Sequence, residues 1–310
     1  MSIAFVFPGQ GAQTIGMGKA LVEAYPAARA VFDEVDEALG EKLSDLIWEG
    51  EIETLTLTEN AQPALMATSI AAVRALEAEG IGLDRVSHVA GHSLGEYSAL
   101  AAAGTFSVAD AARLLRTRGL AMQQAVPVGQ GAMAAVLGLD FNTVTDVAAR
   151  AAEGEVCQVA NENDPAQNVV SGDKAAVERA CVLAKEAGAK RALMLPVSAP
   201  FHCALMAPAA DKMAEALDAV ALQSPSVPLV ANVTAEAVSD PTEIKALLVK
   251  QVTGQVRWKT SVEWMAANGV TEFWEIGAGK ALSGMIRRIA KDAGTRAVGT
   301  PDDIKAALEV

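Results

Sequence analysis

The sequence predicts an α/β protein with a mainly parallel sheet, into which a small ferredoxin-like α+β subdomain is inserted. Short apolar runs alternate with segments of helical periodicity near both ends of the chain, as is typical of strands and helices in such a sheet. Between the two ends, shorter elements follow the order β-α-β-β-α-β, which is the ferredoxin-like pattern. Half of the 310 residues are apolar, which is enough for a large core.

The first part of the chain alternates strands and helices up to residue 126. An apolar run at 3–7 ends at Pro8-Gly9, which indicates a buried strand followed by a loop. Apolar residues at helical spacing predict a helix over 17–39, and Pro63 is tolerated in the first turn of the next helix. The remaining elements expected here are a helix at 60–80, a strand at 86–90, and helices at 96–103 and 108–126.

A glycine-rich break at 127–131 separates this part from the predicted insertion. We therefore expect a small ferredoxin-like subdomain at 128–198 and a larger, discontinuous α/β subdomain made of 1–127 and 199–310. The elements expected within the insertion are a strand at 133–139, a helix at 144–152, strands at 156–160 and 168–171, a helix at 174–186 and a strand at 191–195.

Larger elements resume after the insertion. Because they alternate as the elements before the insertion do, we expect both ends of the chain to share one mainly parallel sheet. These elements are a helix at 206–220, a strand at 229–232, a helix at 262–267, a strand at 272–276 and a helix at 280–290.

Composition argues against several classes of function. A net charge of −13 disfavours a general nucleic-acid binder, which needs a basic surface. The N-terminal segment has no basic lead and the apolar runs are too short to cross a bilayer, so we expect neither a signal peptide nor a membrane association. The three cysteines and three histidines lack the spacings of disulfide frameworks or metal sites, which predicts a cytoplasmic protein without a metal.

The stretch Gly91-His-Ser-Leu-Gly95 fits the pattern G-x-S-x-G and lies between a predicted strand and a predicted helix. In a hydrolase-like α/β core this turn is tight, requires small neighbours and exposes the serine hydroxyl above the sheet. The following helix places backbone N–H groups near a developing oxyanion. A glycine-flanked turn with a capping serine is the alternative, but the strand–turn–helix context favours Ser93 as a nucleophile.

A nucleophilic serine needs a base, and His202 is the favoured candidate among the three histidines. His202 lies in a loop after the insertion, between Pro200-Phe201 and a run of apolar residues. His88 lies on the strand before the nucleophile, where a packing or solvent-facing role is expected. For His92, a role in lining a pocket and a plain turn position remain equally open.

No acidic residue that would orient His202 can be named from the sequence. Asp164, Asp173 and Asp211 all lie in polar stretches that we expect to be exposed. Either the third member of the site is distant in sequence or a carbonyl group takes its place.

Arg118 occupies an unusual position on the predicted helix 108–126. The residues three and four positions away are apolar, which places the guanidinium on a core-facing side. A buried guanidinium is costly unless an anion meets it. An internal salt bridge and a socket for a substrate carboxylate explain this placement equally well.

Taken together, these stretches resemble the malonyl-CoA:acyl carrier protein transacylases of bacterial type II fatty acid synthesis, essentially from end to end. The combination of FPGQGAQ and GHSLGEY, in this order and spacing, is highly specific. Small departures at Ala278 and Ala281, where relatives often carry proline and valine, do not touch the chemistry. The main matching stretches are Val6 to Gln13, Asn60 to Leu65, Gly91 to Leu100, Arg118-Gly119, Pro200 to Cys203 and Glu275 to Lys280.

This resemblance implies roles for six residues at the matching positions. Ser93 would be acylated and His202 would act as general base, with a backbone carbonyl in place of the missing acid. The backbone N–H groups of two residues would form the oxyanion hole, and an arginine would hold the malonyl carboxylate. Of the two explanations given above for the core-facing arginine, the resemblance thus favours the socket for a substrate carboxylate. These further residues are Gln251 for the carbonyl, Gln10 and Leu94 for the oxyanion hole, and Arg118 for the carboxylate.

The resemblance also implies the reaction and its partners. Malonyl-CoA would be the substrate, the phosphopantetheine thiol of an acyl carrier protein the acceptor, and no cofactor would be permanently bound. We expect a monomer. Alternatives are a discrete acyltransferase serving polyketide synthesis, a serine esterase or thioesterase that uses water, and a non-catalytic scaffold, against which the Ser93–His202 pair argues.

Overall fold

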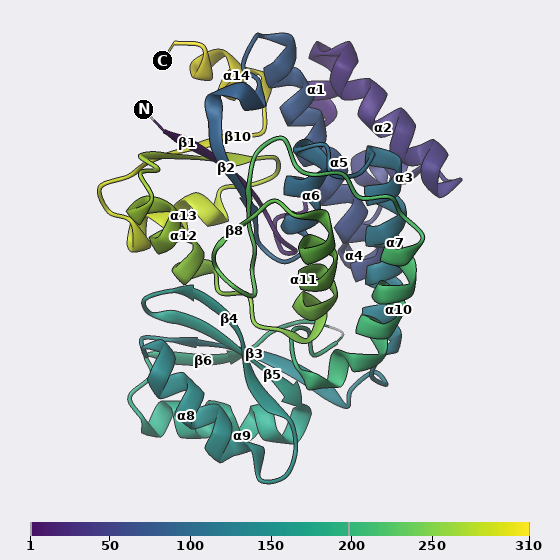
Figure 1. The fold of residues 1–310 in the computed structure, drawn as a ribbon. Helices are drawn as coiled ribbons and strands as arrows, with labels where there is room; N and C mark the ends of the chain where they lie inside the picture. The colour runs from purple at the N-terminus through teal and green to yellow at the C-terminus, as the bar shows by residue number, and fades with distance from the viewer. Residues whose placement is uncertain (1, 198, 310) are drawn as a thin grey trace.

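The computed structural model describes residues 2–197 and 199–309, which form two sheets with helices around them (Figure 1). One sheet has six strands in the order β10-β9-β1-β2-β7-β8, parallel except for the β7–β8 pair. The other has four antiparallel strands in the order β4-β5-β3-β6. The predicted fold class, a mainly parallel α/β core with an inserted ferredoxin-like unit, is confirmed.

The six-stranded sheet collects its strands from both ends of the chain. Its first elements are β1 Ile3–Phe7, α1 Lys19–Ala24, α2 Pro26–Leu39, α3 Leu43–Glu49, α4 Ile52–Thr56, α5 Thr58–Ala78, the 3-10 turn Leu83–Arg85, β2 Val86–Gly91, α6 Gly95–Ala102 and α7 Val108–Gln124. After the insertion follow the 3-10 turn Ala204–Met206, α10 Ala207–Asp218, β7 Leu229–Val230, β8 Ala237–Val238, α11 Pro241–Thr253, α12 Trp258–Ala267, β9 Glu272–Ile276, α13 Ala281–Ile289, β10 Gly294–Val298 and α14 Pro301–Ala307.

The four-stranded sheet is made entirely of the predicted insertion. Its boundaries at 128 and 198 stay a prediction, and residue 198 lies outside the described residues, as do the chain ends 1 and 310. Its elements are β3 Gly131–Leu137, α8 Phe141–Ala152, β4 Cys157–Asp164, β5 Gln167–Asp173, α9 Lys174–Glu186 and β6 Arg191–Met194.

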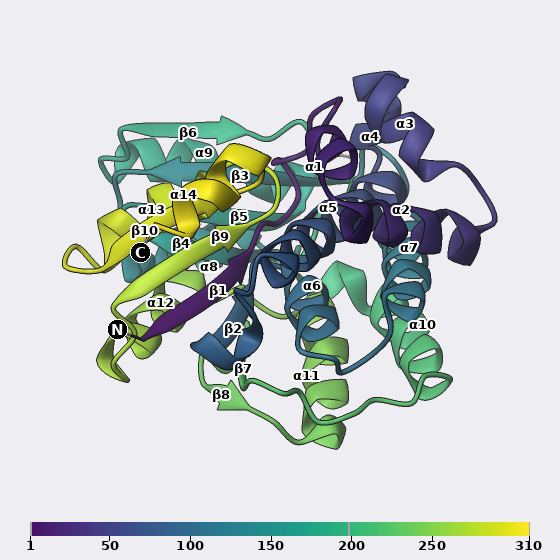
Figure 2. The ribbon, with the colours of Figure 1, turned by 90° about the horizontal axis from the view of Figure 1, so that it is seen from above.

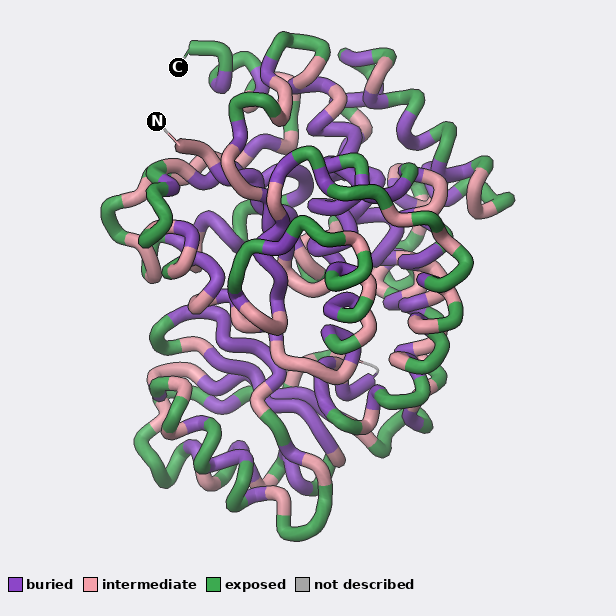
Figure 3. Tube along the Cα trace, in the orientation of Figure 1, coloured by how far each residue is buried: buried purple, intermediate pink, exposed green. Residues whose placement is uncertain are grey.

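Both faces of the six-stranded sheet are covered by helices, and its central strand β1 is accordingly apolar throughout. On β1, Phe5 and Phe7 face the larger cluster formed with α2, α5, α6 and α7, whereas Ala4 and Val6 face α12 and α13. Figure 2 shows this layering with the two groups of helices on opposite sides of the strands. The interior is buried along β1 from Ala4 to Phe7 and along α5 from Ala61 to Val73, while the outer helices of the small sheet alternate between buried and exposed residues (Figure 3).

Several elements differ from the sequence-based expectation, and the short elements α3, α4 and β8 are among those that were not predicted. The helix predicted over 17–39 is broken at Tyr25, because Pro26 lacks an N–H and starts a second helix at its first position. The helix α11 was not predicted, although Ile244, Leu247, Leu248 and Val252 lie at helical spacing. The two elements β10 and α14 at the C-terminus were not predicted either.

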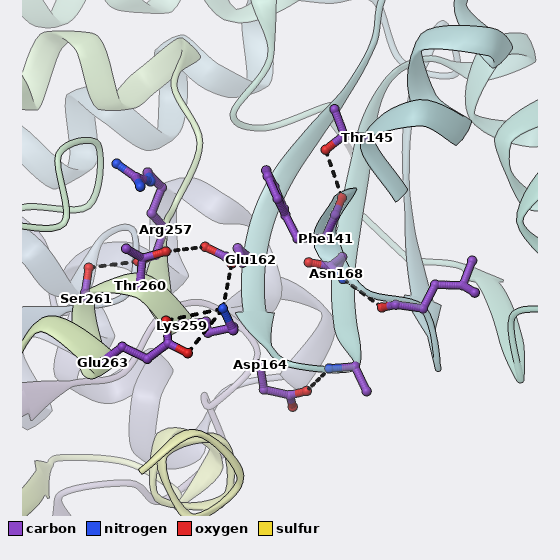
Figure 4. Close-up of polar contacts among 12 residues, drawn as sticks. Phe141, Thr145, Glu162, Asp164, Asn168, Arg257, Lys259, Thr260, Ser261 and Glu263 are labelled. Atoms are coloured by element: carbon purple, nitrogen blue, oxygen red, sulfur yellow. Dashed lines mark hydrogen bonds and ion pairs between the residues drawn. The ribbon is translucent and has the colours of Figure 1, made fainter. Parts of the chain in front are cut away.

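The two sheets are joined through β4. The backbone N–H of Glu162 donates to the Val256 carbonyl at 3.0 Å, and Val256 donates to the carbonyl of Ala160 at 2.8 Å. The Glu162 side chain lies 3.3 Å from the Lys259 ammonium and accepts a hydrogen bond of 2.6 Å from Thr260 on α12 (Figure 4). This junction fixes the small sheet beside the loop that carries His202.

The expectation that Asp164 is exposed was wrong. Only 3% of its side chain is accessible, and its carboxylate lies 2.7 Å from Arg288 Nε on α13. Asp164 therefore serves the junction between the sheets. Within the described residues, no helix is long and apolar enough to cross a membrane.

Candidate active site

Ser93 lies in a tight turn between β2 and α6. Its backbone φ is 55°, a left-handed conformation that is uncommon for a residue with a side chain. Two glycines allow the turn: a Cβ at Gly91 would lie 1.9 Å from the Gly95 backbone, and one at Gly95 would lie 2.2 Å from the Phe7 carbonyl oxygen. The turn thus brings the serine hydroxyl to the carboxyl ends of β1 and β2.

The Ser93 hydroxyl and His202 form a close pair. Ser93 Oγ lies 2.7 Å from His202 Nε2, although 109 residues separate them. On the other side of the ring, Nδ1 lies 2.9 Å from the Gln251 carbonyl oxygen and 3.2 Å from that of Gly254. Carbonyl oxygens only accept hydrogen bonds, so Nδ1 carries the proton and Nε2 is free to accept one from Ser93.

The electrostatic surroundings of His202 keep its ring neutral. Only 4% of the residue is exposed, and burial, with the charge of Arg118, lowers the pKa of His202 from 6.5 to about 3. Among the described residues, no carboxylate contacts the ring. The two backbone carbonyls therefore orient His202 where a catalytic triad would use an acid.

Arg118 reaches the same place from α7. Its side chain is 1% exposed, and Nη2 lies 3.2 Å from Ser93 Oγ. Nη1 donates to Gln62 Oε1 at 2.7 Å, and Nη2 donates to Gln251 Oε1 at 2.8 Å. Gly119 lets α7 approach α5 closely, since a Cβ there would lie 2.5 Å from the Glu59 Cα.

Arg118 has no ion-pair partner within the described part of the chain, and its Nε donates to no protein acceptor there. The internal salt bridge weighed for it is therefore not formed. Burial lowers the pKa of Arg118, but a guanidinium stays protonated under ordinary conditions. A charged guanidinium held by neutral amides next to a nucleophile is suited to receive a carboxylate from outside.

Gln10 and Leu94 both line the cavity beside Ser93. Within residues 2–197 and 199–309, neither N–H donates to a protein acceptor, whereas the neighbouring amides of Ser93 and Gly95 donate to Asn232 Oδ1 and the His92 carbonyl. Two amides that border a cavity without protein acceptors are suited to stabilise an oxyanion.

The cavity in front of Ser93 has a volume of about 330 Å³. Its walls come from the loop after β1, the helices α5 and α7, and the loop after β6, with Phe201 beside the base. His92 lines the cavity and its Nε2 lies 2.9 Å from Asn163 Oδ1, so the pocket-lining role is the one observed. His88 instead packs edge-on against Trp264, and Cys203 is buried with its pKa raised by desolvation.

Sequence reasoning missed several polar residues around these groups. Asn232, at the end of β7, accepts from the Ser93 amide, and its Nδ2 donates to the Gly91 carbonyl at 2.6 Å. Gln62 lies in one of the matching stretches, but the sequence did not predict its hydrogen bond to Arg118. The described residues contain no group of three or more His, Cys, Asp or Glu side chains placed to hold a metal ion.

Comparisons with known proteins agree along the whole chain. The acyl transferase domain family matches residues 4–300. The malonyl CoA-acyl carrier protein transacylase of Bacillus subtilis (strain 168) is 50% identical over 308 residues, covering 99% of this chain and 96% of the relative. The crystal structure of an acyl-carrier-protein-S-malonyltransferase from Bartonella henselae is similar with a TM-score of 0.98 at 57% identity, covering 100% of this chain and 99% of that one. A type II PKS acyl-carrier protein in complex with its malonyl-transacylase gives a TM-score of 0.97 at 42% identity, covering 100% and 99%.

Proposed function

The chain belongs to the acyl transferase family and, within it, to the malonyl CoA-acyl carrier protein transacylases, and from this premise we propose how its residues move a malonyl group from coenzyme A to a carrier protein. The observation that supports the proposal is the arrangement around one hydroxyl. Ser93 Oγ lies 2.7 Å from a neutral imidazole nitrogen and 3.2 Å from a buried guanidinium. A nucleophile, a base and a carboxylate-binding group thus meet at one point.

In the first half-reaction, His202 Nε2 takes the proton from Ser93 Oγ as the oxygen attacks the thioester carbonyl of malonyl-CoA. The carbonyl oxygen becomes an oxyanion that the backbone N–H groups of Gln10 and Leu94 stabilise, each by about 3 kcal/mol if typical. The C–S bond then breaks, and His202 returns the proton to the leaving thiolate. The products are free coenzyme A and a malonyl ester on Ser93.

The second half-reaction reverses these roles with a different thiol. His202 takes the proton of the phosphopantetheine thiol, and the sulfur attacks the ester carbonyl of malonyl-Ser93. When the tetrahedral intermediate collapses, the C–Oγ bond breaks and His202 reprotonates Ser93. His202 is neutral at the start and at the end of each half-reaction. It therefore carries no permanent positive charge that a buried acid would have to balance.

Arg118 supplies the preference for malonyl. Two parallel hydrogen bonds to the substrate carboxylate would compensate its buried charge. An acetyl group offers no anion, which costs roughly 3–4 kcal/mol, or about two to three decades in rate. Methylmalonyl also carries a carboxylate, so Arg118 does not reject it, and its exclusion would fall to neighbours such as Phe201.

We also propose the setting in which this reaction occurs. The partner is an acyl carrier protein carrying phosphopantetheine, no cofactor is permanently bound, and the enzyme acts as a cytoplasmic monomer in fatty acid synthesis. One solved relative is in complex with a type II PKS acyl-carrier protein, so polyketide synthesis is the alternative pathway. Parallel assays with a fatty acid carrier and a polyketide carrier separate the two, because the native pathway should give the higher kcat/KM.

The intact mass of the protein after brief mixing with malonyl-CoA, acetyl-CoA or methylmalonyl-CoA tests the mechanism. We expect a malonyl-sized increase that is absent in Ser93→Ala and a much slower gain from acetyl-CoA. Carrier protein should then remove the adduct faster than buffer does. An adduct that survives in Ser93→Ala would refute the nucleophile, and turnover that does not depend on carrier protein would favour an esterase.

A further inference from the structure

Glu96 is a buried carboxylate that the mechanism above does not use. It lies in the first turn of α6, three residues after the nucleophile, and none of its surface is exposed. Its Oε2 accepts hydrogen bonds from Gln251 Nε2 at 2.6 Å and from the Asn232 backbone N–H at 3.3 Å. Its Oε1 has no partner among the described residues.

The side chain of Gln251 connects Glu96 to Arg118. Arg118 only donates hydrogen bonds, so the atom it contacts at 2.8 Å must be the Gln251 amide oxygen. The amide nitrogen then points to the Ser93 carbonyl oxygen at 2.9 Å and to Glu96 Oε2. In this orientation the Gln251 amide oxygen faces a donor and the amide nitrogen faces acceptors. The flipped orientation would place the amide nitrogen, a donor, against Arg118.

Glu96 has no cation at ion-pair distance within the described part of the chain. Burial raises the pKa of Glu96 to about 7, and the positive charge of Arg118 acts in the opposite direction. Tyr97, the next residue on α6, is a further titratable group that interacts with Glu96, and burial raises the pKa of Tyr97. A carboxylate kept in such surroundings lowers stability, as is common for groups retained for function.

We propose that Glu96 is a positioning residue, whose carboxylate fixes the Gln251 amide and so aims the Arg118 guanidinium at the carboxylate of the incoming acyl group. Gln251 thereby has two separate tasks. Its backbone carbonyl orients His202, and its side chain transmits the position of Glu96 to Arg118. This inference rests on the proposed function, since it deepens the role of Arg118 in selecting malonyl groups.

The test compares the loading of malonyl and acetyl groups onto Ser93 in Glu96→Gln. This substitution keeps the shape and one acceptor but removes the charge. We expect kcat/KM for malonyl-CoA to fall about tenfold, mainly through KM, because a charge-assisted contact is weakened. Acetyl loading, which does not use Arg118, should change less than twofold. Glu96→Leu removes the acceptor as well and should lose malonyl preference further.

A matched control is Glu275→Gln. Glu275 is equally buried, but its carboxylate accepts from the backbone N–H groups of Leu282 and Ser283 at the start of α13. We expect the malonyl-to-acetyl ratio to be unchanged in this variant. It reports what the loss of any buried carboxylate does to the fold, which thermal unfolding of all variants measures in parallel.

The outcomes separate the two proposals. Equal losses with malonyl-CoA and acetyl-CoA in Glu96→Gln would mean that Glu96 has only a structural role, and unchanged rates with both would likewise overturn the inference. If Glu96→Leu does not fold, Glu96→Gln alone decides. If the unmodified enzyme forms no malonyl-Ser93, the proposed function fails, and the inference on Glu96 fails with it.

Discussion

The buried, neutral state of His202 predicts an unusual pH profile for the loading of Ser93. The imidazole lies between Ser93 Oγ and two backbone carbonyls, and the nearby guanidinium of Arg118 further opposes its protonation. Its pKa is lowered from 6.5 to about 3. The free enzyme should therefore keep its base in the active form well below neutral pH.

The size of the effect follows from the two pKa values. A histidine with a pKa of 6.5 would be only about 3% neutral at pH 5, so kcat/KM would fall about thirtyfold between pH 8 and pH 5. With a pKa near 3, about 99% of His202 is neutral at pH 5, so the protonation of His202 should leave the rate nearly unchanged over this range. At pH 5, a histidine with a pKa of 4 would still be about 90% neutral.

The assay is the pH dependence of kcat/KM for malonyl transfer to Ser93, measured with malonyl-pantetheine because it carries no phosphate that titrates in this range. Glu96 has a pKa of about 7 and titrates within the same window, so the profile is measured in parallel on Glu96→Gln. A thirtyfold fall centred near pH 6.5 that persists in Glu96→Gln would refute the reasoning. A flat profile in that variant would support it.

Three further outcomes are expected. Arg118→Met should lower kcat/KM for malonyl-CoA by about two to three decades while acetyl loading is retained, which steady-state kinetics with both thioesters measures. Gly91→Ala should destabilise the protein by about 3 kcal/mol or more and abolish acylation, since its Cβ would lie 1.9 Å from the Gly95 backbone, whereas Gly284→Ala, with its nearest neighbour at 3.9 Å, should be tolerated. The folded-state pKa of His202 lies below its unfolded value, so its contribution to stability is present above pH 6.5 and lost as the pH falls. Chemical denaturation at pH 7.5 and pH 4.5 measures this loss in the unmodified protein and in His202→Ala. Between the two pH values, the free energy of unfolding of the unmodified protein should drop by about 2–3 kcal/mol more than that of the variant. A constant difference between the two proteins would contradict this.

The sequence was informative where a local pattern has a local cause. The strand, turn and helix around Ser93 follow from an apolar run and two glycines, and a core-facing arginine follows from helical spacing. The same reasoning could not place Asp164, because the polar run at 161–164 is buried between two sheets and its charges are paired by residues more than 90 positions away. A pattern of apolar residues therefore cannot predict a buried strand that is made of polar residues.

The surroundings of Gln251 were harder to predict for a related reason. Its helix, α11, buries a regular stripe of residues, and Gln251 is the one polar member of that stripe, at a position where an apolar residue is expected. The resemblance implied a role for the Gln251 carbonyl, which the structure places 2.9 Å from His202 Nδ1. It gave no sign that the amide side chain contacts Arg118, Glu96 and Asn232, because those contacts depend on tertiary packing.

The use of a main-chain oxygen to orient His202 has an evolutionary consequence. Every amino acid at position 251 supplies a carbonyl, so mutation there cannot remove the group that holds the base, provided that α11 keeps its course. A substitution at the same position would instead change the side-chain contact to Arg118, for which we propose the role of selecting the acyl group. Substitutions at position 251, in evolution or in a directed-evolution library, could therefore change which acyl donors are accepted while His202 keeps its position.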